Sequence, residues 1–282
     1  MRWAGRRRSS NVEDRRGVRF KGVGGIGIGT VVLALIAIYF GQDPSVVLQG
    51  VQSSGVQSEQ VPYQESADEA QLREFISVVL ADTEDTWNAL FASAGRTYEE
   101  PVLVLFSGAV ESACGFAQAA VGPFYCPADH RVFIDLSFYR DLQDRFGAPG
   151  DFAQAYVIAH EVGHHVQTLL GISEQTMAAR RSASQAEANA LSVRQELQAD
   201  CFAGIWAHNA DRSRQLLETG DIEEGLNAAR AIGDDRLQRQ SQGYIAPESF
   251  THGSSEQRAR WFKRGYESGE VAACDTFAAK DV

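Results

Sequence analysis

The chain has 282 residues, of which 44% are hydrophobic and 22% are charged, and this composition is that of an ordinary globular protein with a sizeable core. Residues 1–22 carry eight basic and two acidic side chains, a net charge of +6. Because the whole chain has a net charge of −11, the residues after 22 carry a net charge of −17. An acidic main body argues against nucleic-acid binding by the main domain.

An uncharged apolar segment follows the basic residues, from Val23 to Phe40. These eighteen residues (23–40) just reach the length of a membrane span. The segment ends in Ile-Tyr-Phe with no small-residue cleavage site close by, which favours a retained signal anchor over the alternative, a cleaved signal peptide. Positive charge on its N-terminal side predicts a basic head in the cytoplasm (1–22), one transmembrane helix, and the rest of the chain outside the cell membrane.

Residues 41–66 are rich in Gln, Ser, Gly and Val without periodicity, which predicts a flexible linker to a folded domain over residues 67–282. Apolar residues at helical spacing, with acids in the first turn, predict a helix over residues 68–91. Short apolar and β-branched runs predict strands at residues 101–107 and 131–136.

The four cysteines are expected to form disulfides. Cys114 and Cys126 lie in one loop, and no further Cys or His pair nearby completes a zinc pattern. In an extracytoplasmic domain a disulfide is the better interpretation. Four cysteines allow three pairings, which the sequence does not decide. Proximity favours Cys114–Cys126, which leaves Cys201–Cys274.

The rest of the domain is mainly helical in pattern, so the expected fold class is α+β, mainly helical, with a small sheet. The predicted helices cover residues 138–146, 151–171 with Asp151 as the cap, 184–208, 220–240 with an interruption near Gly233, and a C-terminal aromatic and basic segment around Trp261.

The second of these regions, residues 151–171, contains the sequence His160-Glu161-Val-Gly-His164. In a helix the two histidines lie on one face, one turn apart, so their nitrogens can converge on one cation such as zinc. Glu161 lies about 100° further round, where its carboxylate can take a proton from a metal-activated water. Gly163 costs the helix up to ~1 kcal/mol relative to alanine, which indicates close approach of a neighbouring backbone.

The motif also has a plain interpretation, because five-residue patterns arise by chance and two histidines can be ordinary polar residues. They fall here within an apolar segment, however, where unpartnered histidine and glutamate would cost kilocalories. The metal interpretation is therefore favoured. His165 lies a further 100° round and is expected at the surface or behind the ligands. His130 and His208 are expected to be structural.

A third ligand is available in the helix over residues 184–208. Glu196 and Asp200 are four residues apart, so both carboxylates face the same way. One can bind the metal while the other accepts the free N–H of a ligand histidine. Two such acids are more often a solvated helix face, but apolar neighbours downstream of the histidine motif reverse that preference.

With both motifs in view, the chain resembles the gluzincin metallopeptidases and, more closely, the neutral zinc metallopeptidase family of bacteria. The matching stretches are Gly122-Pro-Phe-Tyr-Cys-Pro, Val132-Phe-Ile-Asp-Leu-Ser-Phe, the His160 motif, Glu196-Leu-Gln-Ala-Asp200, Gly233-Asp-Asp-Arg-Leu-Gln and Thr251-His-Gly-Ser-Ser-Glu-Gln-Arg258. The resemblance implies a zincin-like fold and peptidase activity. It also implies that Glu196 is the third zinc ligand and that Asp200 orients a ligand histidine.

The stretch from Thr251 to Arg258 resembles a histidine-containing loop of membrane-associated gluzincins, with an arginine six residues after the histidine. His252 could then donate to the oxyanion that peptide hydrolysis develops. The alternative is a loop histidine that caps the following helix. Tyr244 is a weaker candidate for the same donor.

We therefore expect a zinc metalloendopeptidase-like hydrolase at the outer side of the cell membrane, acting on a protein or peptide substrate and not on nucleic acid. His160, His164 and Glu196 would bind Zn²⁺, and Glu161 would be the general base. Two alternatives stay open: a zinc hydrolase of another amide, such as a cell-wall component, and a catalytically silent, membrane-anchored interaction protein. Glu161 argues against the second, since zinc binding alone does not require it.

Overall fold

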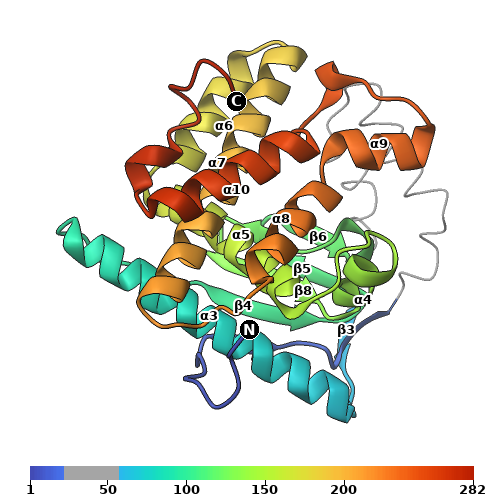
Figure 1. Ribbon diagram of the computed structural model, residues 1–282. Coiled ribbons are helices and arrows are strands. Elements are labelled where there is room, and N and C mark those ends of the chain that lie inside the picture. The colour runs from blue at the N-terminus through green and yellow to red at the C-terminus, as the bar shows by residue number, and fades with distance from the viewer. Residues whose placement is uncertain (22–56) are drawn as a thin grey trace.

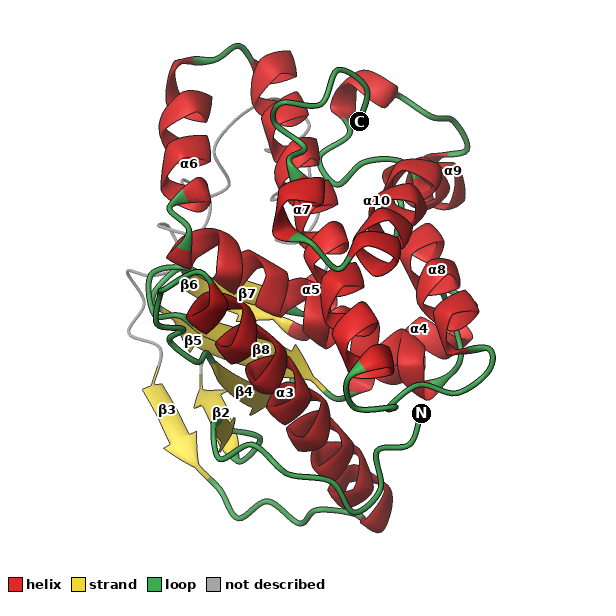
Figure 2. Ribbon diagram, turned by 60° about the vertical axis from the view of Figure 1, so that its left-hand side comes forward, coloured by secondary structure: helices red, strands yellow, loops and turns green. Residues whose placement is uncertain are grey.

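The computed structural model describes residues 1–21 and 57–282, and it confirms a mainly helical α+β fold with a small sheet (Figures 1 and 2). The strands are β1 (Val12–Asp14), β2 (Val18–Lys21), β3 (Gln57–Gln60), β4 (Val102–Phe106), β5 (Ala109–Ser112), β6 (Gly115–Gln118), β7 (Phe124–Cys126) and β8 (Arg131–Asp135). The α-helices are α3 (Ala67–Ser93), α4 (Ser137–Asp144), α5 (Asp151–Leu169), α6 (Ile172–Ser182), α7 (Gln185–Arg212), α8 (Asp221–Ala231), α9 (Asp234–Gln242) and α10 (Ser255–Ser268). Short 3-10 turns cover Ala119–Val121, Pro247–Ser249 and Val271–Cys274.

The largest sheet has the strand order β1-β4-β8-β7, with β1, β4 and β8 parallel and β7 antiparallel to β8. Alternate residues of β4 point to opposite faces, as the period of a strand requires. Leu103 and Leu105 join the main core with the helices, whereas Val104 and Phe106 join a smaller cluster with Val110 of β5. The helices and the β5–β6 hairpin therefore cover opposite faces of this sheet.

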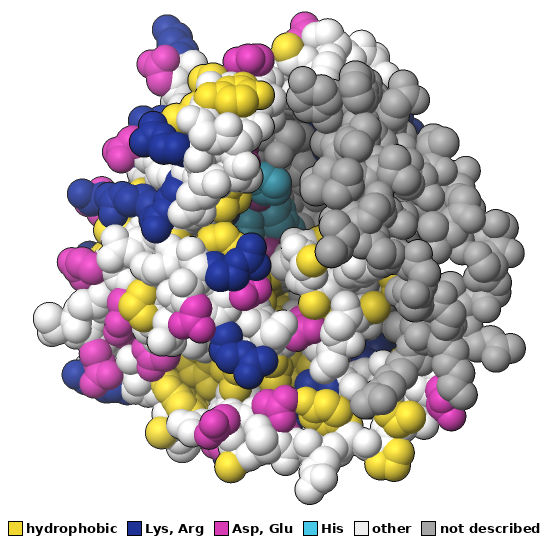
Figure 3. Space-filling view, turned by 90° about the vertical axis from the view of Figure 1, so that its right-hand side faces the viewer, with side chains coloured by type: hydrophobic (Ala, Val, Ile, Leu, Met, Phe, Trp, Pro, Cys, Tyr) yellow, Lys and Arg dark blue, Asp and Glu magenta, His cyan; other side chains and the backbone are white. Residues whose placement is uncertain are grey.

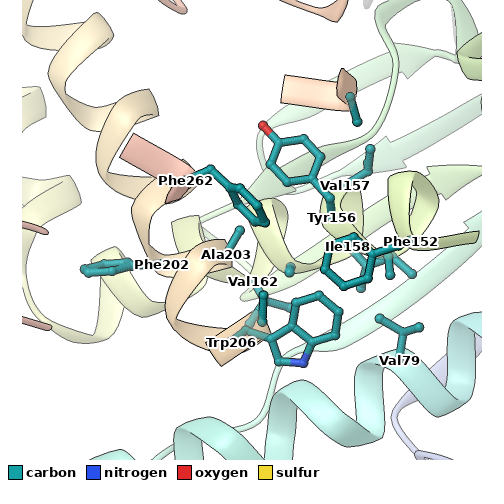
Figure 4. Close-up of a cluster of buried hydrophobic side chains, with 14 of the residues drawn as sticks. Val79, Phe152, Tyr156, Val157, Ile158, Val162, Phe202, Ala203, Trp206 and Phe262 are labelled. Atoms are coloured by element: carbon teal, nitrogen blue, oxygen red, sulfur yellow. The ribbon is translucent and has the colours of Figure 1, made fainter. Parts of the chain in front are cut away.

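Helix α5 lies at the centre of the helical layer. Its side chains Phe152, Tyr156 and Val162 interdigitate with residues of α7 and α10, and the ring of Tyr156 lies in this cluster while its hydroxyl points out of it (Figure 4). Phe152 stacks on Trp206 of α7 with ring centroids 5.7 Å apart. Burial of such side chains stabilises by about 1.5–3 kcal/mol each, so the position of α5 is well determined.

Helices α7 and α10 approach so closely that their backbones touch. A Cβ atom on Gly204 would lie 2.1 Å from the carbonyl oxygen of Phe262, and one on Gly265 would lie 1.9 Å from that of Cys201. Only glycine fits at these two positions. The Cys201–Cys274 disulfide joins the C-terminal segment to the same helix, and Cys114–Cys126 closes the loop before β8. Both predicted pairs are confirmed.

Most predicted helix boundaries are confirmed within a few residues, including the break at Gly233 between α8 and α9. Ser66 and Ser184 form capping boxes with Glu69 and Glu187, which satisfy free amides of the first turns of α3 and α7. The prediction that Asp151 caps α5 is wrong. The N-cap is Gly150, and the Asp151 carboxylate instead accepts hydrogen bonds from the amino group of Met1 at 3.1 Å.

The beginning of the chain differs from its prediction. Residues 1–21 are not a separate head, because β1 pairs with β4 in the largest sheet and β2 pairs with β3. The end of the predicted linker is also structured, since Gln57–Gln60 is strand β3. The predicted anchor, residues 23–40, lies outside the described residues. Among the helices of the described segments, none is long and apolar enough to cross a membrane.

Candidate metal centre

The two sequence motifs meet because α5 and α7 touch at one glycine. A Cβ on Gly163 would lie 2.9 Å from the carbonyl oxygen of Ala199, so this position accepts no side chain without a shift of the backbone. The expectation that Gly163 permits a close approach is confirmed. Because the helices touch here, the histidines of α5 lie opposite the acids of α7.

Three potential ligands converge at this contact. The Nε2 atoms of His160 and His164 lie 3.2 and 3.5 Å from the two carboxylate oxygens of Glu196. The candidate ligand atoms of the three residues all lie within 4.8 Å of one another. Two imidazole nitrogens and one carboxylate oxygen are a donor set that zinc takes, with a position left for water. The structure therefore brings together the three residues that the sequence predicted as ligands.

Each of the two histidines is held at its other ring nitrogen. The Nδ1 atom of His160 lies 2.8 Å from Oδ1 of Asp200, and that of His164 lies 2.9 Å from Oε1 of Gln167. Gln167 is buried and donates its amide N–H groups to the Gln195 carbonyl at 2.7 Å and to Gln198 at 3.0 Å. Because the Nδ1 atoms are engaged in this way, both Nε2 atoms face the Glu196 carboxylate and are available to a metal ion.

Asp200 is a fully buried carboxylate surrounded by donors. Arg258 donates from Nε to Oδ2 at 2.9 Å and from Nη2 to Oδ1 at 3.0 Å, and the Tyr156 hydroxyl donates to Oδ1. Burial alone would raise the pKa of Asp200, but Arg258 and His160 outweigh it and lower that pKa. Burial has the opposite effect on His160, since it would lower the pKa of the imidazole. The charge of Asp200 outweighs burial and raises that pKa to about 10. Asp200 thus stays ionised and strengthens the hydrogen bond that orients His160.

Glu161 faces the same cavity as the potential ligands but is not one of the three converging groups. Within the two described segments, no hydrogen-bond donor engages its carboxylate. It is mostly buried, with 8% of its surface exposed. A carboxylate in this position can accept a proton from a water in the cavity, which is the role the sequence predicted for it.

The cavity has a volume of about 650 Å³, and Figure 3 shows histidine side chains within a hollow of the molecular surface. One part of its wall comes from the loop before β7, where Val121 is 65% exposed. Another comes from α6, where Met177 is 44% exposed. Phe124, Phe138, Phe146, Ile232 and Leu237 add further apolar lining. The lining of the cavity is therefore rich in apolar surface.

His252 also lines this cavity, and half of its side chain is exposed. Its Nδ1 atom lies 3.3 Å from Oδ1 of Asp234, and the other oxygen of Asp234 accepts the backbone N–H groups of Thr251, His252 and Gly253 at 2.6 to 3.1 Å. Burial would lower the pKa of His252, but the hydrogen bond to Asp234 and the charge of Glu196 raise it overall. A protonated imidazole that faces the ligand groups can donate to a developing oxyanion.

Three other predicted residues lie elsewhere. Tyr244 is 58% exposed and is not among the residues that line the cavity, so its hydroxyl is not placed to donate to an oxyanion there. His165 is not at the surface: it is fully buried, with Nδ1 3.0 Å from the Tyr125 hydroxyl and Nε2 2.6 Å from the Glu99 carbonyl. His208 is structural, as expected, since its Nδ1 atom lies 2.7 Å from the Tyr266 carbonyl.

Sequence reasoning missed Tyr156, Gln167 and Asp234. The first two carry a signal, because Tyr156 precedes His160 by four residues and Gln167 follows His164 by three. Asp234 lies in the matching stretch that begins at Gly233, but it is eighteen residues from His252, and this spacing does not indicate that the two side chains meet.

The fold and the site define a protein with a two-histidine, one-carboxylate centre of the H-E-x-x-H class. The chain belongs to the putative neutral zinc metallopeptidase family, whose model matches residues 1–277. The family implies zinc and suggests hydrolase activity.

Curated relatives cover three quarters or more of the chain. The uncharacterized protein YpfJ of Escherichia coli (strain K12) is 53% identical over 98% of this chain and 99% of its own length. An uncharacterized protein of Mycobacterium tuberculosis (strain ATCC 25618 / H37Rv) is 41% identical over 76% of this chain and 74% of its own length. No solved structure matches the chain significantly, so the zincin-like fold stays a prediction.

Proposed function

We propose that the protein hydrolyses peptide bonds, with zinc held by His160, His164 and Glu196 and with Glu161 as the general base. The observation that carries this proposal is the convergence of the three ligand groups in a cavity that Glu161 also faces. A purely structural ion would not require a further carboxylate beside an open coordination position.

The residues divide the reaction between them. Zinc, when bound, supplies a Lewis acid and lowers the pKa of a water in the site. Glu161 takes the proton of that water and passes it to the leaving amine. His252 donates a hydrogen bond to the oxyanion of the attacked carbonyl, and Asp234 holds the imidazole for that task.

Asp200 and Gln167 keep the ligand histidines in one tautomer. A ligand imidazole must present an unprotonated Nε2 atom, and an acceptor at Nδ1 fixes the proton on that side. Arg258 balances the charge of Asp200, so the ion pair is neutral inside the core. These three side chains position the ligand histidines.

We also propose that the catalytic domain works outside the cytoplasmic membrane. Two disulfides support this location, because such bonds form and persist in oxidising compartments. A peptide or protein is the proposed substrate, since the cavity is open and has apolar walls on which extended chains can pack.

The test is a cleavage assay with the purified full chain, its Glu161→Gln variant and a chelator-treated sample. The substrates are a mixture of defined peptides and, separately, cell-wall fragments. Peptide cleavage by the zinc-loaded chain alone supports the proposal. Release of products only from the wall fragments would assign a different amide bond, and no zinc-dependent product from either would refute hydrolysis.

A further inference from the structure

The first residues of the chain are part of the catalytic domain. Strand β1 pairs in parallel with β4, with Val12 opposite Leu103 and Asp14 opposite Leu105. Further backbone hydrogen bonds run from Ser9 N–H to the Ser77 carbonyl at 2.9 Å and from Arg15 N–H to the Leu105 carbonyl at 2.7 Å. These bonds connect residues 9–15 to both the sheet and helix α3.

Helix α3 carries a buried acid whose partners come from this segment. Glu84 is 1% exposed, and its carboxylate accepts hydrogen bonds from Arg7 at 3.0 Å, from the Ser9 hydroxyl, and from Asn11 at 3.0 Å. An ionised carboxylate in the core without such donors would strongly destabilise the fold. The sequence of α3 is therefore suited to a domain that includes residues 7–11.

The N-terminal segment in turn carries a buried basic residue, Arg16, that pairs with an acid from the rest of the domain. Arg16 is 3% exposed and pairs with Asp14 of its own segment and with Glu65, just before α3. Arg73 of α3 shares the Glu65 carboxylate at 2.9 Å. Arg8 pairs with Glu74 of α3 as well. Arg7, Arg8 and Arg16, which belong to the basic stretch expected in the cytoplasm, are instead paired with acids of the domain.

The chain leaves the domain and returns to it at adjacent positions. Strand β2 pairs antiparallel with β3, so Lys21 lies opposite Gln57 and Val18 lies opposite Gln60. One passage through a bilayer, about 30 Å thick, between these two residues would place the paired strands on opposite sides. The pairing and a single passage are incompatible.

We propose that residues 1–21 lie in the same compartment as residues 57–282, so that the chain does not cross the membrane once between them. This arrangement replaces the single-pass topology expected from charge and hydropathy alone.

The test compares two single-cysteine variants of the full chain in its own cells, Ser10→Cys near the N-terminus and Ser182→Cys at the end of α6. Both positions are exposed, and all four native cysteines are paired, so each variant carries one free thiol. A membrane-impermeant maleimide is applied to intact and to permeabilised spheroplasts. Detergent-solubilised protein, in which both thiols react, is the control.

Equal labelling of the two variants before permeabilisation supports the shared compartment. If both are labelled only after permeabilisation, residues 1–21 still share the domain's compartment, and the proposed extracytoplasmic location is refuted instead. Labelling of one variant alone in intact spheroplasts overturns the inference. As a second measurement, the Val18→Cys/Gln60→Cys double variant should form a cross-link on oxidation, detected as a disulfide-linked peptide by mass spectrometry. Absence of that peptide would contradict the β2–β3 pairing.

Discussion

Gly163 and Ala199 lie in direct backbone contact, because a Cβ on the glycine would come within 2.9 Å of the alanine carbonyl oxygen. The distance between the histidine helix and the acid helix is set here. A Gly163→Ala substitution should force α5 and α7 apart and lower stability by about 1–3 kcal/mol, as overpacking does. Zinc affinity should fall with it, because Glu196 moves away from the histidines. Calorimetry and zinc titration measure both, and a loss of stability with unchanged affinity would contradict the spacing role.

Glu161→Gln should separate catalysis from metal binding. The amide keeps the shape of the side chain but cannot take a proton, so the peptidase rate should fall by about 10²–10⁴-fold. Zinc content should remain near one ion per chain, because Glu161 is not among the converging groups. Metal analysis of the purified variant beside the rate assay checks this. Loss of zinc in this variant would mean that the base and ligand roles are misassigned.

Glu196→Gln should instead lose metal. It replaces an anionic ligand with a neutral amide, so zinc affinity and activity should fall together. Asp200→Asn should lie between this variant and the wild type, at about 10–100-fold in affinity or activity, since it contacts the ligand His160 and not the ion. Competition with a zinc-binding dye ranks the affinities. If Asp200→Asn bound zinc more weakly than Glu196→Gln, the two acids would have exchanged roles.

His252→Ala should lower kcat with little change in KM or zinc content. The imidazole faces the cavity and would act mainly when negative charge develops on the substrate, a contribution of about 10²–10³-fold for a single donor. Tyr244→Phe is the matched control, because Tyr244 does not line the cavity, and it should keep the wild-type rate. Steady-state kinetics on one defined peptide compare them. Wild-type kcat in His252→Ala would leave the histidine with only a loop-stabilising role.

The two disulfides should differ in their effect on stability. Cys201 and Cys274 are 73 residues apart, and Cys114 and Cys126 are 12 apart. In the chain-entropy model the longer loop contributes about 4.5 kcal/mol and the shorter about 3 kcal/mol. The Cys201→Ala/Cys274→Ala double variant should therefore melt at a lower temperature than the Cys114→Ala/Cys126→Ala variant. Thermal denaturation followed by circular dichroism decides the order.

The sequence predicted the candidate site well because helical periodicity determines direction. Residues four apart on one helix face the same way, which was sufficient for His160 with His164 and for Glu196 with Asp200. The glycine between the histidines also indicated close approach of a neighbouring backbone, which is that of Ala199. Gln167 was missed although it lies at helical spacing, since its importance depends on contacts with Gln195 and Gln198 across α7.

The N-terminal segment shows why local patterns fail for other parts of the fold. Seven arginines and a lysine before an apolar stretch predict a cytoplasmic head, because charge is read without knowledge of its partners. Two of the acids that neutralise these residues, Glu74 and Glu84, follow more than sixty residues later. Strands β5, β6 and β7 were missed because they are three or four residues long and their apolar pattern is weak.

The hydrogen bonds of His160 and His164 to Asp200 and Gln167 have a consequence for metal exchange. The scaffold orders the coordinating groups during folding, so ion capture does not have to organise them, unlike in small domains that fold only around their zinc. A chelator should therefore abolish the activity without unfolding the protein, and added zinc should restore the activity of the same molecules. Activity could then rise and fall reversibly with the zinc supply of the surroundings over the lifetime of a single chain.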